Sequence, residues 1–180
     1  MSVMAGITTT TISKWLNNTQ ISRVMSNTPA SLGLAASGIY FAPKTKLVQK
    51  EIILSIMNTI GKTYVFDNEK FIDKITAVAA SSPAYIFYFL EAMIETAINQ
   101  FGFTSEVARD ITLQVVKGSL AMIEQNPDTE LKQLRANVTS KKGTTEQAIN
   151  VFEKSELKQI ITNAEIACYN RAKELGAMFN

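Results

Sequence analysis

Residues 83–101 form the most apolar stretch of the chain, and this stretch constrains the fold more than any other feature. Pro83 falls in the first turn of the expected helix, where a missing N–H costs no hydrogen bond. The stretch is apolar on all sides as far as Leu90, which is typical of a helix enclosed by protein. Glu91 and Glu95 interrupt it, and ionised side chains are costly inside a bilayer. We therefore predict a buried central helix and no membrane span.

Helical periodicity continues over most of the chain from residue 44 onward. Apolar residues three and four apart mark the helices, and Pro, Thr, Gly and Asn-Pro signals mark their starts and ends. The expected helices cover residues 47–60, 69–79, 81–101, 104–125 with Thr104 as cap, 129–138, a stretch beginning at 144, and 155–175 closed by Gly176. Residues 63–66 are expected to be an extended link. The pattern predicts a mainly α chain.

The first 43 residues differ from the rest, because their apolar and β-branched runs are short. The expected strands cover residues 2–7, 21–25 and 36–42, and residues 8–16 are expected to form a short helix. Asn27-Thr28-Pro29 has turn chemistry, since Pro29 fixes its own φ and pushes Thr28 towards extended geometry. Three short strands this far apart do not make an independent sheet. We therefore predict that residues 1–43 are the end of another domain and that a helical domain covers residues 44–180.

The composition excludes several classes of function. The 18 basic and 16 acidic residues are mixed along the chain, so no nucleic-acid-binding surface is expected. The chain has no histidine, which removes Ser-His-Asp and Cys-His catalysis and argues against a zinc site. Cys168 is the only cysteine, so we expect a small buried side chain, no internal disulfide and a cytoplasmic protein. A charged fraction of 19% is low and predicts extra buried surface, such as a subunit interface.

The loop over residues 138–145, Val-Thr-Ser-Lys-Lys-Gly-Thr-Thr, is the strongest candidate for a binding site. It leads directly into a helix N-terminus, where free backbone N–H groups and the helix dipole attract anions. Ser140, Thr144 and Thr145 add hydroxyls, and two lysines add positive charge, so a small carboxylate is a plausible ligand. Thr144 and Gln147 have the spacing of a capping box. Periodicity alone favours the simpler interpretation of a capped helix start beside a solvated basic loop.

Two weaker candidates have simpler explanations. Residues 80–84 are small and begin a helix, which would permit the close approach of a ligand but is more typical of a packing turn. Glu91 and Glu95 could act as paired carboxylates, although a polar stripe on one helix is the simpler interpretation. No Gly-x-Gly-x-x-Gly occurs, so the chain offers no dinucleotide-binding fingerprint.

Four segments, in order along almost the whole chain, resemble the pyrroline-5-carboxylate reductase family. Residues 4–7, Met-Ala-Gly-Ile, look like the last strand of that family's Rossmann domain. Residues 23–30, Arg-Val-Met-Ser-Asn-Thr-Pro-Ala, resemble its Met-Pro-Asn-Thr-Pro segment. Residues 75–85, Ile-Thr-Ala-Val-Ala-Ala-Ser-Ser-Pro-Ala-Tyr, resemble its Thr-Gly-Leu-Ser-Gly-Ser-Gly-Pro-Ala-Tyr motif. Residues 138–145 resemble its Val-Thr-Ser-Pro/Lys-Gly-Gly-Thr-Thr loop.

The resemblance implies a helical-bundle dimerisation and substrate-binding domain at residues 44–180. It also implies that residues 1–43 are a short β remnant of an α/β Rossmann domain, whose glycine-rich cofactor-binding units would precede Met1. The implied assembly is an intertwined homodimer, often built further into a ring of dimers, in the cytoplasm. The implied location of the substrate site is near the dimer interface.

The reaction implied by the resemblance belongs to proline biosynthesis. Hydride would pass from C4 of NAD(P)H to the imine carbon of 1-pyrroline-5-carboxylate and give L-proline. The N–H groups around Gly143, Thr144 and Thr145 would hold the substrate carboxylate, the Thr145 hydroxyl would reach the ring nitrogen, and Ser140 would shape the loop. The protein would contribute mainly positioning and anion binding.

The resemblance also implies where the cofactor would lie. Asn27 and Thr28 would border the nicotinamide end of NAD(P)H in the intact enzyme. Since the cofactor's main binding units are expected outside this chain, NAD(P)H should bind the chain weakly and the chain should not reduce substrate alone.

Three residues depart from the family pattern. Ala80 and Ser82 stand where the family has glycine, and Lys142 stands for the first glycine of the Gly-Gly pair. A side chain at a position that needs positive φ carries an energetic cost and would reshape the pocket.

Three interpretations of function remain open. The first is an enzyme fragment that dimerises and retains part of the active site. The alternative is a non-catalytic helical scaffold or binding module derived from a reductase. The third is a domain of a related hydroxyacid-type dehydrogenase, against which the Ser-Lys-Lys-Gly-Thr-Thr loop argues.

Overall fold

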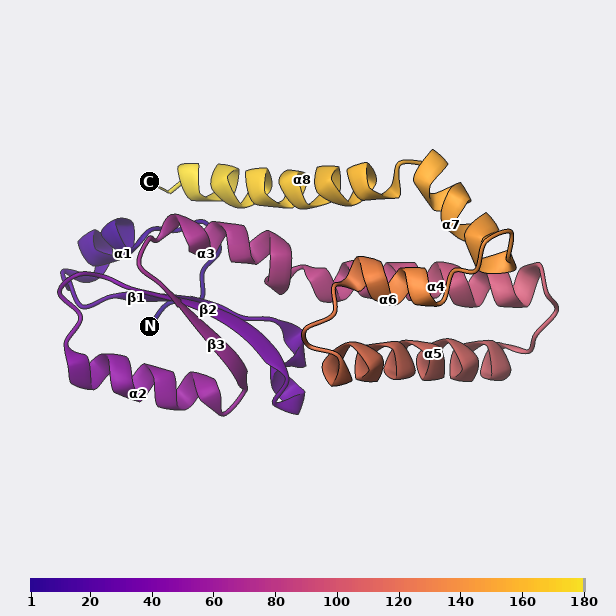
Figure 1. Cartoon of the computed structure of the whole chain (residues 1–180). Helices are drawn as coiled ribbons and strands as arrows, with labels where there is room; N and C mark the ends of the chain where they lie inside the picture. The colour runs from indigo at the N-terminus through magenta and orange to yellow at the C-terminus, as the bar shows by residue number, and fades with distance from the viewer. Residues whose placement is uncertain (180) are drawn as a thin grey trace. The chain divides into compact units, whose positions relative to one another are not determined.

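A computed structural model describes residues 1–179 of the chain (Figure 1). In chain order its elements are α1 (Thr9–Leu16), β1 (Ser22–Met25), η1 (Thr28–Leu32), β2 (Ala35–Phe41), α2 (Leu47–Asn58), β3 (Gly61–Phe66), α3 (Lys70–Ile75), η2 (Thr76–Ala80), α4 (Ser82–Asn99), α5 (Ser105–Gln125), α6 (Leu131–Asn137), α7 (Thr144–Lys154) and α8 (Leu157–Ala177). The chain divides into two compact units, Met1–Tyr85 with Thr162–Asn180, and Ile86–Ile161. The expectation of a mainly α fold with a small β part is confirmed.

A three-stranded sheet in the order β1-β2-β3 organises the first unit. Strand β1 runs antiparallel to β2, with Val24 opposite Ile39, and β2 runs parallel to β3, with Gly38 opposite Tyr64. Parallel neighbours need a long crossover, and α2 supplies it. Gly61 begins β3 with φ +147, and a Cβ there would lie 2.2 Å from the Ala35 carbonyl oxygen, so only glycine fits this close approach.

The sheet corrects two expectations. The strands expected at residues 21–25 and 36–42 are confirmed within a residue or two, but residues 2–7 contribute only an isolated bridge between Ser2 and Arg23. The extended link expected at residues 63–66 is part of strand β3, which pairs with β2 along its whole length. Nothing in the sequence indicated that this link pairs with other strands. Half-buried strands are recognised by alternating apolar and polar residues, but most side chains of β3 are accessible and show no such alternation.

Helix α2 covers one face of the sheet, and α1 and α3 lie over the other (Figure 1). On the α2 side, Val24, Ile39 and Met57 form a buried cluster. The partly buried apolar residues that pack against this cluster are Phe41, Ile53, Leu54 and Ile60. Because Val24 and Ile39 are paired across the strands and Met57 comes from the crossover helix, burial of this cluster fixes both the register and the position of α2.

The opposite face is held by a buried arginine. Arg23 on β1 is 1% exposed, and its Nη2 lies 2.7 Å from Asp73 Oδ1 while its Nη1 lies 3.2 Å from Glu69 Oε1. The Glu69 carboxylate also accepts the Thr9 N–H at 2.6 Å and the Thr9 hydroxyl at 2.8 Å. A carboxylate at the first residue of a helix is favoured by the helix dipole. One ionic network therefore joins β1, the start of α1 and helix α3.

Helix α8 approaches the N-terminal segment at two glycines. A Cβ on Gly176 would lie 2.1 Å from the Gly6 carbonyl oxygen, and a Cβ on Gly6 would lie 2.3 Å from the Ala172 carbonyl oxygen. Contacts this short exclude any side chain at either position. Gly176 was expected to close the helix, but it lies inside α8 and serves this backbone contact instead.

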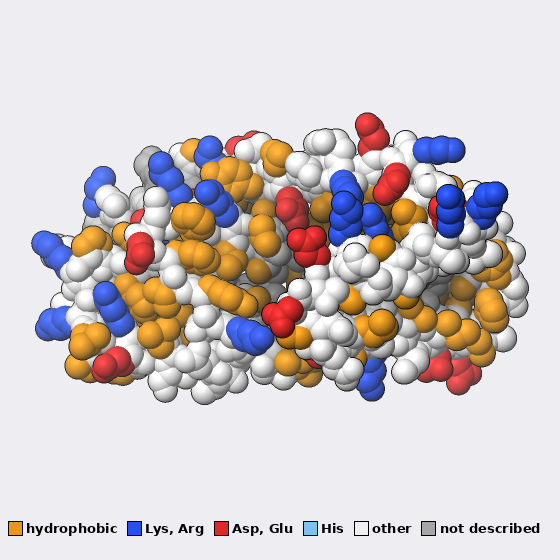
Figure 2. Space-filling view, viewed as in Figure 1, with side chains coloured by type: hydrophobic (Ala, Val, Ile, Leu, Met, Phe, Trp, Pro, Cys, Tyr) orange, Lys and Arg blue, Asp and Glu red, His pale blue; other side chains and the backbone are white. Residues whose placement is uncertain are grey.

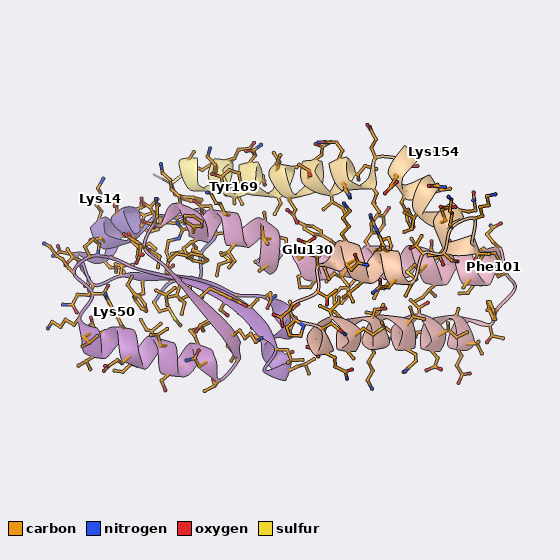
Figure 3. The ribbon with its side chains drawn as sticks, in the orientation of Figure 1. Lys14, Lys50, Phe101, Glu130, Lys154 and Tyr169 are labelled. Atoms are coloured by element: carbon orange, nitrogen blue, oxygen red, sulfur yellow. The ribbon has the colours of Figure 1, made fainter. Side chains whose placement is uncertain are left out.

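The second unit consists of helices. Within it, α4 ends before Gly102, which has φ +73, and the Thr104 hydroxyl accepts the Val107 N–H as the cap of α5, as predicted. Phe101, labelled in Figure 3 near the end of α4, is 71% exposed.

The central helix is not buried in the single chain, contrary to our prediction. No described residue of α4 is buried, and Phe87 and Tyr88 are 64% and 75% exposed. Apolar side chains also lie at the surface over α4 and α5 in Figure 2. The sequence pattern correctly indicated a helix apolar on all sides, but the described residues 1–179 do not bury it.

The helical run Lys70–Asn99 is long and apolar enough to cross a membrane, judged by length and composition alone. A core helix of a soluble protein meets the same criteria, so this observation is weak evidence for a span.

We predict that Arg23→Met lowers the free energy of unfolding by about 3 kcal/mol, because it leaves two neighbouring carboxylates without their buried cation. The control is Arg171→Met, which removes an exposed pair with Glu174 whose partners are 59% and 60% accessible. That control should cost less than about 1 kcal/mol. Urea unfolding at equilibrium measures both changes, and equal losses for the two variants would contradict the role of the buried network.

Candidate functional site

A tight turn builds the loop between α6 and α7. The Thr139 hydroxyl donates to the Arg135 carbonyl at 2.6 Å, which anchors the loop to the end of α6. The Gly143 N–H donates to the Ser140 carbonyl at 2.9 Å and closes a four-residue turn. Lys142, at the third position of that turn, has φ +62. Turns with positive φ at this position favour glycine, so Lys142 has the positive φ expected there, and the strain this would cause stays a prediction.

The start of α7 differs from the predicted capping box. Gly143 is the N-cap residue, Thr144 is the first helical residue, and no side chain caps the helix. A Cβ on Gly143 would lie 2.4 Å from Ser140 Oγ, so the turn requires glycine where the cap falls. The Glu146 carboxylate accepts the Lys142 N–H at 2.8 Å, which ties the turn to the first turn of α7. The prediction of a capping box was wrong, because the turn over residues 140–143 places the N-cap at Gly143 and not at Thr144.

The first turn of α7 leaves backbone donors available. The first N–H groups of any helix have no partner within the helix. No hydrogen bond of the described residues uses the N–H groups of Thr144, Thr145 or Glu146. The Gly143 N–H is already donated to the Ser140 carbonyl. Among the predicted site residues, Thr144 and Thr145 are therefore the ones with free backbone N–H groups. With the helix dipole, these groups form a site for a small anion.

The charges around this site are mixed. Lys141 and Lys142 are exposed and supply positive charge next to the free N–H groups. Glu146 supplies negative charge in the same turn, but its carboxylate already accepts the Lys142 N–H. The arrangement suits an anion held mainly by backbone donors, with the lysines raising its local concentration.

The predicted cofactor-side residues lie in the other compact unit. Asn27 follows β1 with extended backbone, and Thr28 begins the short helix η1 with an exposed side chain. The Asn27 Oδ1 accepts the Ala36 N–H at 3.1 Å, and its Nδ2 donates to the Ala79 carbonyl at 3.2 Å. The loop over residues 138–145 and the turn at residues 27–28 are therefore two local sites, one in each unit.

The segment before α4 carries a polar cluster that sequence reasoning missed. The Cys168 thiol on α8 donates to Ser81 Oγ at 3.2 Å, so Cys168 is partly buried and hydrogen-bonded instead of packing as a simple apolar residue. Burial raises the pKa of the neighbouring Tyr85 phenol, and its hydrogen bond with Cys168 adds to the shift. Ala80 lies in the π-helical turn η2 and Ser82 begins α4, and neither has positive φ, so the strain expected there does not arise. These contacts join residues 87 positions apart, which no local pattern reveals.

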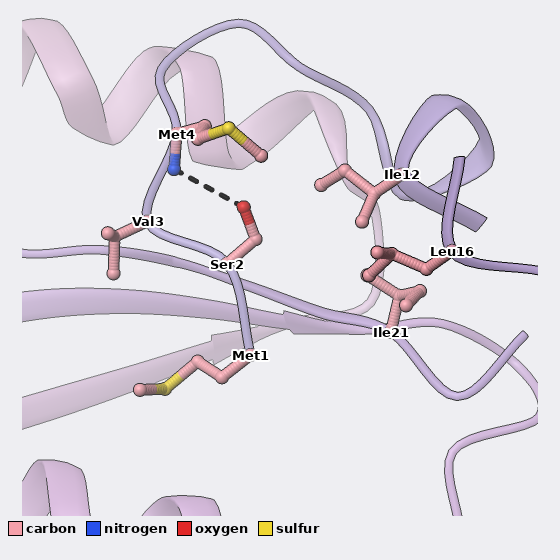
Figure 4. A pocket seen from close by; sticks show the side chains of 7 residues that line it. All are labelled: Met1, Ser2, Val3, Met4, Ile12, Leu16 and Ile21. Atoms are coloured by element: carbon pink, nitrogen blue, oxygen red, sulfur yellow. Dashed lines mark hydrogen bonds between the residues drawn. The ribbon is translucent and has the colours of Figure 1, made fainter. Parts of the chain in front are cut away.

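A cavity of about 310 Å³ beside the N-terminus is shown in Figure 4. It is lined by Met1, Ser2, Val3, Met4, Ile12, Leu16 and Ile21. Its one polar side chain, Ser2, accepts the Met4 N–H at 3.4 Å. A cavity without titratable side chains offers little to orient a polar substrate, so the two sites above are better candidates.

Comparison with known proteins identifies related sequences. The family model described as "Pyrroline-5-carboxylate reductase dimerisation" matches residues 69–175. The pyrroline-5-carboxylate reductase of Vibrio alginolyticus is 38% identical over 180 residues, which cover 99% of this chain and 66% of the relative. The Pasteurella multocida (strain Pm70) reductase is 36% identical and is covered to 65%. The chain thus spans about two thirds of the length of these relatives, 66% and 65%.

Solved structures agree with the sequence relatives. A pyrroline-5-carboxylate reductase from Coxiella burnetii superposes with a TM-score of 0.84 at 41% identity, covering 95% of this chain and 63% of that one. Plasmodium falciparum pyrroline carboxylate reductase, solved with NADP bound, superposes with a TM-score of 0.90 at 27% identity, covering 97% and 70%.

We predict that Lys142→Gly raises the free energy of unfolding by about 0.5–1 kcal/mol, because it removes a side chain from left-handed backbone. The matched control is Lys141→Gly, in the same loop but without positive φ, which should lower stability by about 0.5 kcal/mol. Thermal and urea unfolding measure the two changes. If both substitutions shift stability in the same direction, the strain assigned to Lys142 is absent.

Proposed function

We propose, from the premise that this chain belongs to the pyrroline-5-carboxylate reductase family, that it is part of an enzyme reducing 1-pyrroline-5-carboxylate to L-proline with NAD(P)H. The family match over residues 69–175 and identities of 38% and 41% over nearly the whole chain support this proposal. The observation that carries it is the set of free N–H groups at the start of α7, because they suit the one fixed charge of the substrate, its carboxylate.

The substrate would be held by the loop over residues 138–145. The N–H groups of Thr144 and Thr145 would bind the carboxylate, and the Thr145 hydroxyl would reach the ring nitrogen. Ser140 and Gly143 would shape the site, since the Ser140 carbonyl accepts the Gly143 N–H and a Cβ on Gly143 would lie 2.9 Å from that same carbonyl oxygen. Fixing the carboxylate and the nitrogen would orient the imine carbon, which is the positioning that hydride transfer requires.

Only the nicotinamide end of the cofactor would contact this chain. NAD(P)H supplies the hydride when bound, as the NADP-bound Plasmodium falciparum relative suggests for the family. Thr28 and the backbone of Asn27 would border the nicotinamide. The chain contains no glycine-rich phosphate-binding fingerprint, so these residues fit the reactive end of the cofactor and not its diphosphate. The chain alone would bind NAD(P)H weakly.

The assembly we propose is a homodimer. Helix α4 exposes Ile86, Phe87, Tyr88 and Phe89, each at least 46% accessible, and large exposed apolar side chains around a helix are typical of an interface. A second copy of the chain is the occupant that the dimerisation family indicates. A ring of dimers and a cytoplasmic location are proposed from family membership alone.

The boundary between the two parts of the enzyme is also a proposal. We predicted a division at residue 43, but β3 continues the sheet to Phe66 and the family match begins at residue 69. We therefore propose that residues 1–68 are the end of the nucleotide-binding part and that the dimerisation part begins near residue 69.

Hydrogen exchange tests the substrate loop directly. L-proline should slow exchange of the Thr144 and Thr145 amides, because its carboxylate would accept these N–H groups. Pyrrolidine, which has the same ring without the carboxylate, should leave them unchanged and serves as the matched control. Equal exchange with and without proline would contradict the assignment of this loop.

A further inference from the structure

The junction between η2 and α4 has a carbonyl that its own helix cannot satisfy. Ala79 lies in η2, a π-helical turn in which the Ser81 N–H donates to the Thr76 carbonyl five residues back. The α-helical donor for the Ala79 carbonyl would be residue 83, but that residue is Pro83 and has no N–H. The next N–H, from Ala84, donates to the Ser81 carbonyl at 3.0 Å. The half-buried Ala79 carbonyl therefore has no partner in its own helix, and a donor from elsewhere stabilises it.

Asn27 supplies that donor. Its Nδ2 donates to the Ala79 carbonyl at 3.2 Å across 52 positions of sequence. Its Oδ1 accepts the Ala36 N–H at 3.1 Å, where β2 begins. Because each end of the amide holds a backbone group, the side chain has one orientation. The same amide thus ties the end of β1, the start of β2 and the η2–α4 junction together.

Neighbouring hydroxyls reinforce the same region. Ser82 Oγ donates to the Val78 carbonyl at 2.6 Å and supplies a second bond at the junction. The buried Ser37 hydroxyl donates to Ser26 Oγ at 2.8 Å, directly before Asn27. Thr28, the next residue after Asn27, is exposed. The position of Thr28 is therefore set by its neighbours Ser26 and Asn27, whose side chains are held by hydrogen bonds.

We propose that Asn27 is a positioning residue: its side chain holds the turn at residues 27–28 against the η2–α4 junction, so that Thr28 keeps a fixed place beside the nicotinamide. This inference rests on the proposed function. The Asn27 amide acts through Thr28 and does not itself need to contact the cofactor. The need for Asn27 arises from Pro83, which couples the Asn-Thr-Pro and Ser-Ser-Pro-Ala segments through one carbonyl.

A double-mutant cycle in the complete enzyme that contains this chain tests the coupling. Asn27→Ala should lower kcat by about tenfold or more, since small misplacements of reacting groups are costly. The KM for 1-pyrroline-5-carboxylate should stay within about twofold of wild type, because the loop over residues 138–145 is untouched. In the Pro83→Ala background, the new N–H can satisfy Ala79, so adding Asn27→Ala should cost less than about threefold.

Asn126→Ala is the matched control. The Asn126 Nδ2 also donates to a backbone carbonyl, that of Met122 at 2.7 Å, but at an exposed helix end outside both candidate sites. Its kcat should equal that of wild type. A wild-type kcat for Asn27→Ala, or an equal loss with and without the Pro83→Ala substitution, would overturn the inference.

Failure of the proposed function gives a different result. If the wild-type enzyme does not reduce 1-pyrroline-5-carboxylate, the proposed function falls, and the role assigned to Thr28 falls with it. The same four proteins then test the hydrogen bond through urea unfolding, where a smaller loss for Asn27→Ala in the Pro83→Ala background supports the coupling and an equal loss overturns it.

Discussion

The helices of the second unit expose much more apolar surface than they bury, and the rest of the account depends on this imbalance. Between residues 86 and 161 the fully buried residues are Ala108 and Thr112, both small. Large side chains such as Phe87, Tyr88 and Leu120 are more than half exposed. Burial of apolar area is the main driving force for folding, so these helices need cover from another surface. The dimerisation family indicates that a second copy provides it.

The first unit has a more complete interior. Its sheet is fixed on one side by Val24, Ile39 and Met57 and on the other by Arg23 with its two carboxylates. This fixed sheet holds two segments of the proposed site, since the turn at residues 27–28 comes one residue after β1 and the η2–α4 junction follows α3. A firmly held sheet of this kind suits the positioning role that we propose for Asn27.

Sequence reasoning predicted the features that depend on local chemistry. Thr104 caps α5 because its hydroxyl reaches an N–H three residues away. The positive φ of Lys142 was expected from the resemblance, since the family has glycine at this position. Sequence reasoning missed the features that depend on distant partners. Arg23 lies in a run that looks apolar, and its burial becomes possible only through Glu69 and Asp73, which are 46 and 50 positions away.

The α4 prediction was right about the helix and wrong about its surroundings. A helix apolar on all sides must be covered, but the pattern cannot distinguish cover by the same chain from cover by a second one. The capping box failed for a similar reason, since the contact between Ser140 and Gly143 decides where α7 begins. In both cases, the local sequence pattern predicted that a helix forms, but contacts with residues outside the pattern determined where it begins or what covers it.

The central claim is that a second copy of this chain covers α4, and sedimentation velocity tests it most directly. The chain should sediment as a dimer, and Phe87→Glu should shift it towards monomer, because the change places a charge on the proposed interface. Gln133→Glu introduces the same charge at an exposed polar side chain of the short helix α6, where no apolar side chain is lost, and should leave the dimer intact. A wild-type chain that remains monomeric as its concentration is raised, with unfolding independent of concentration, would contradict the account.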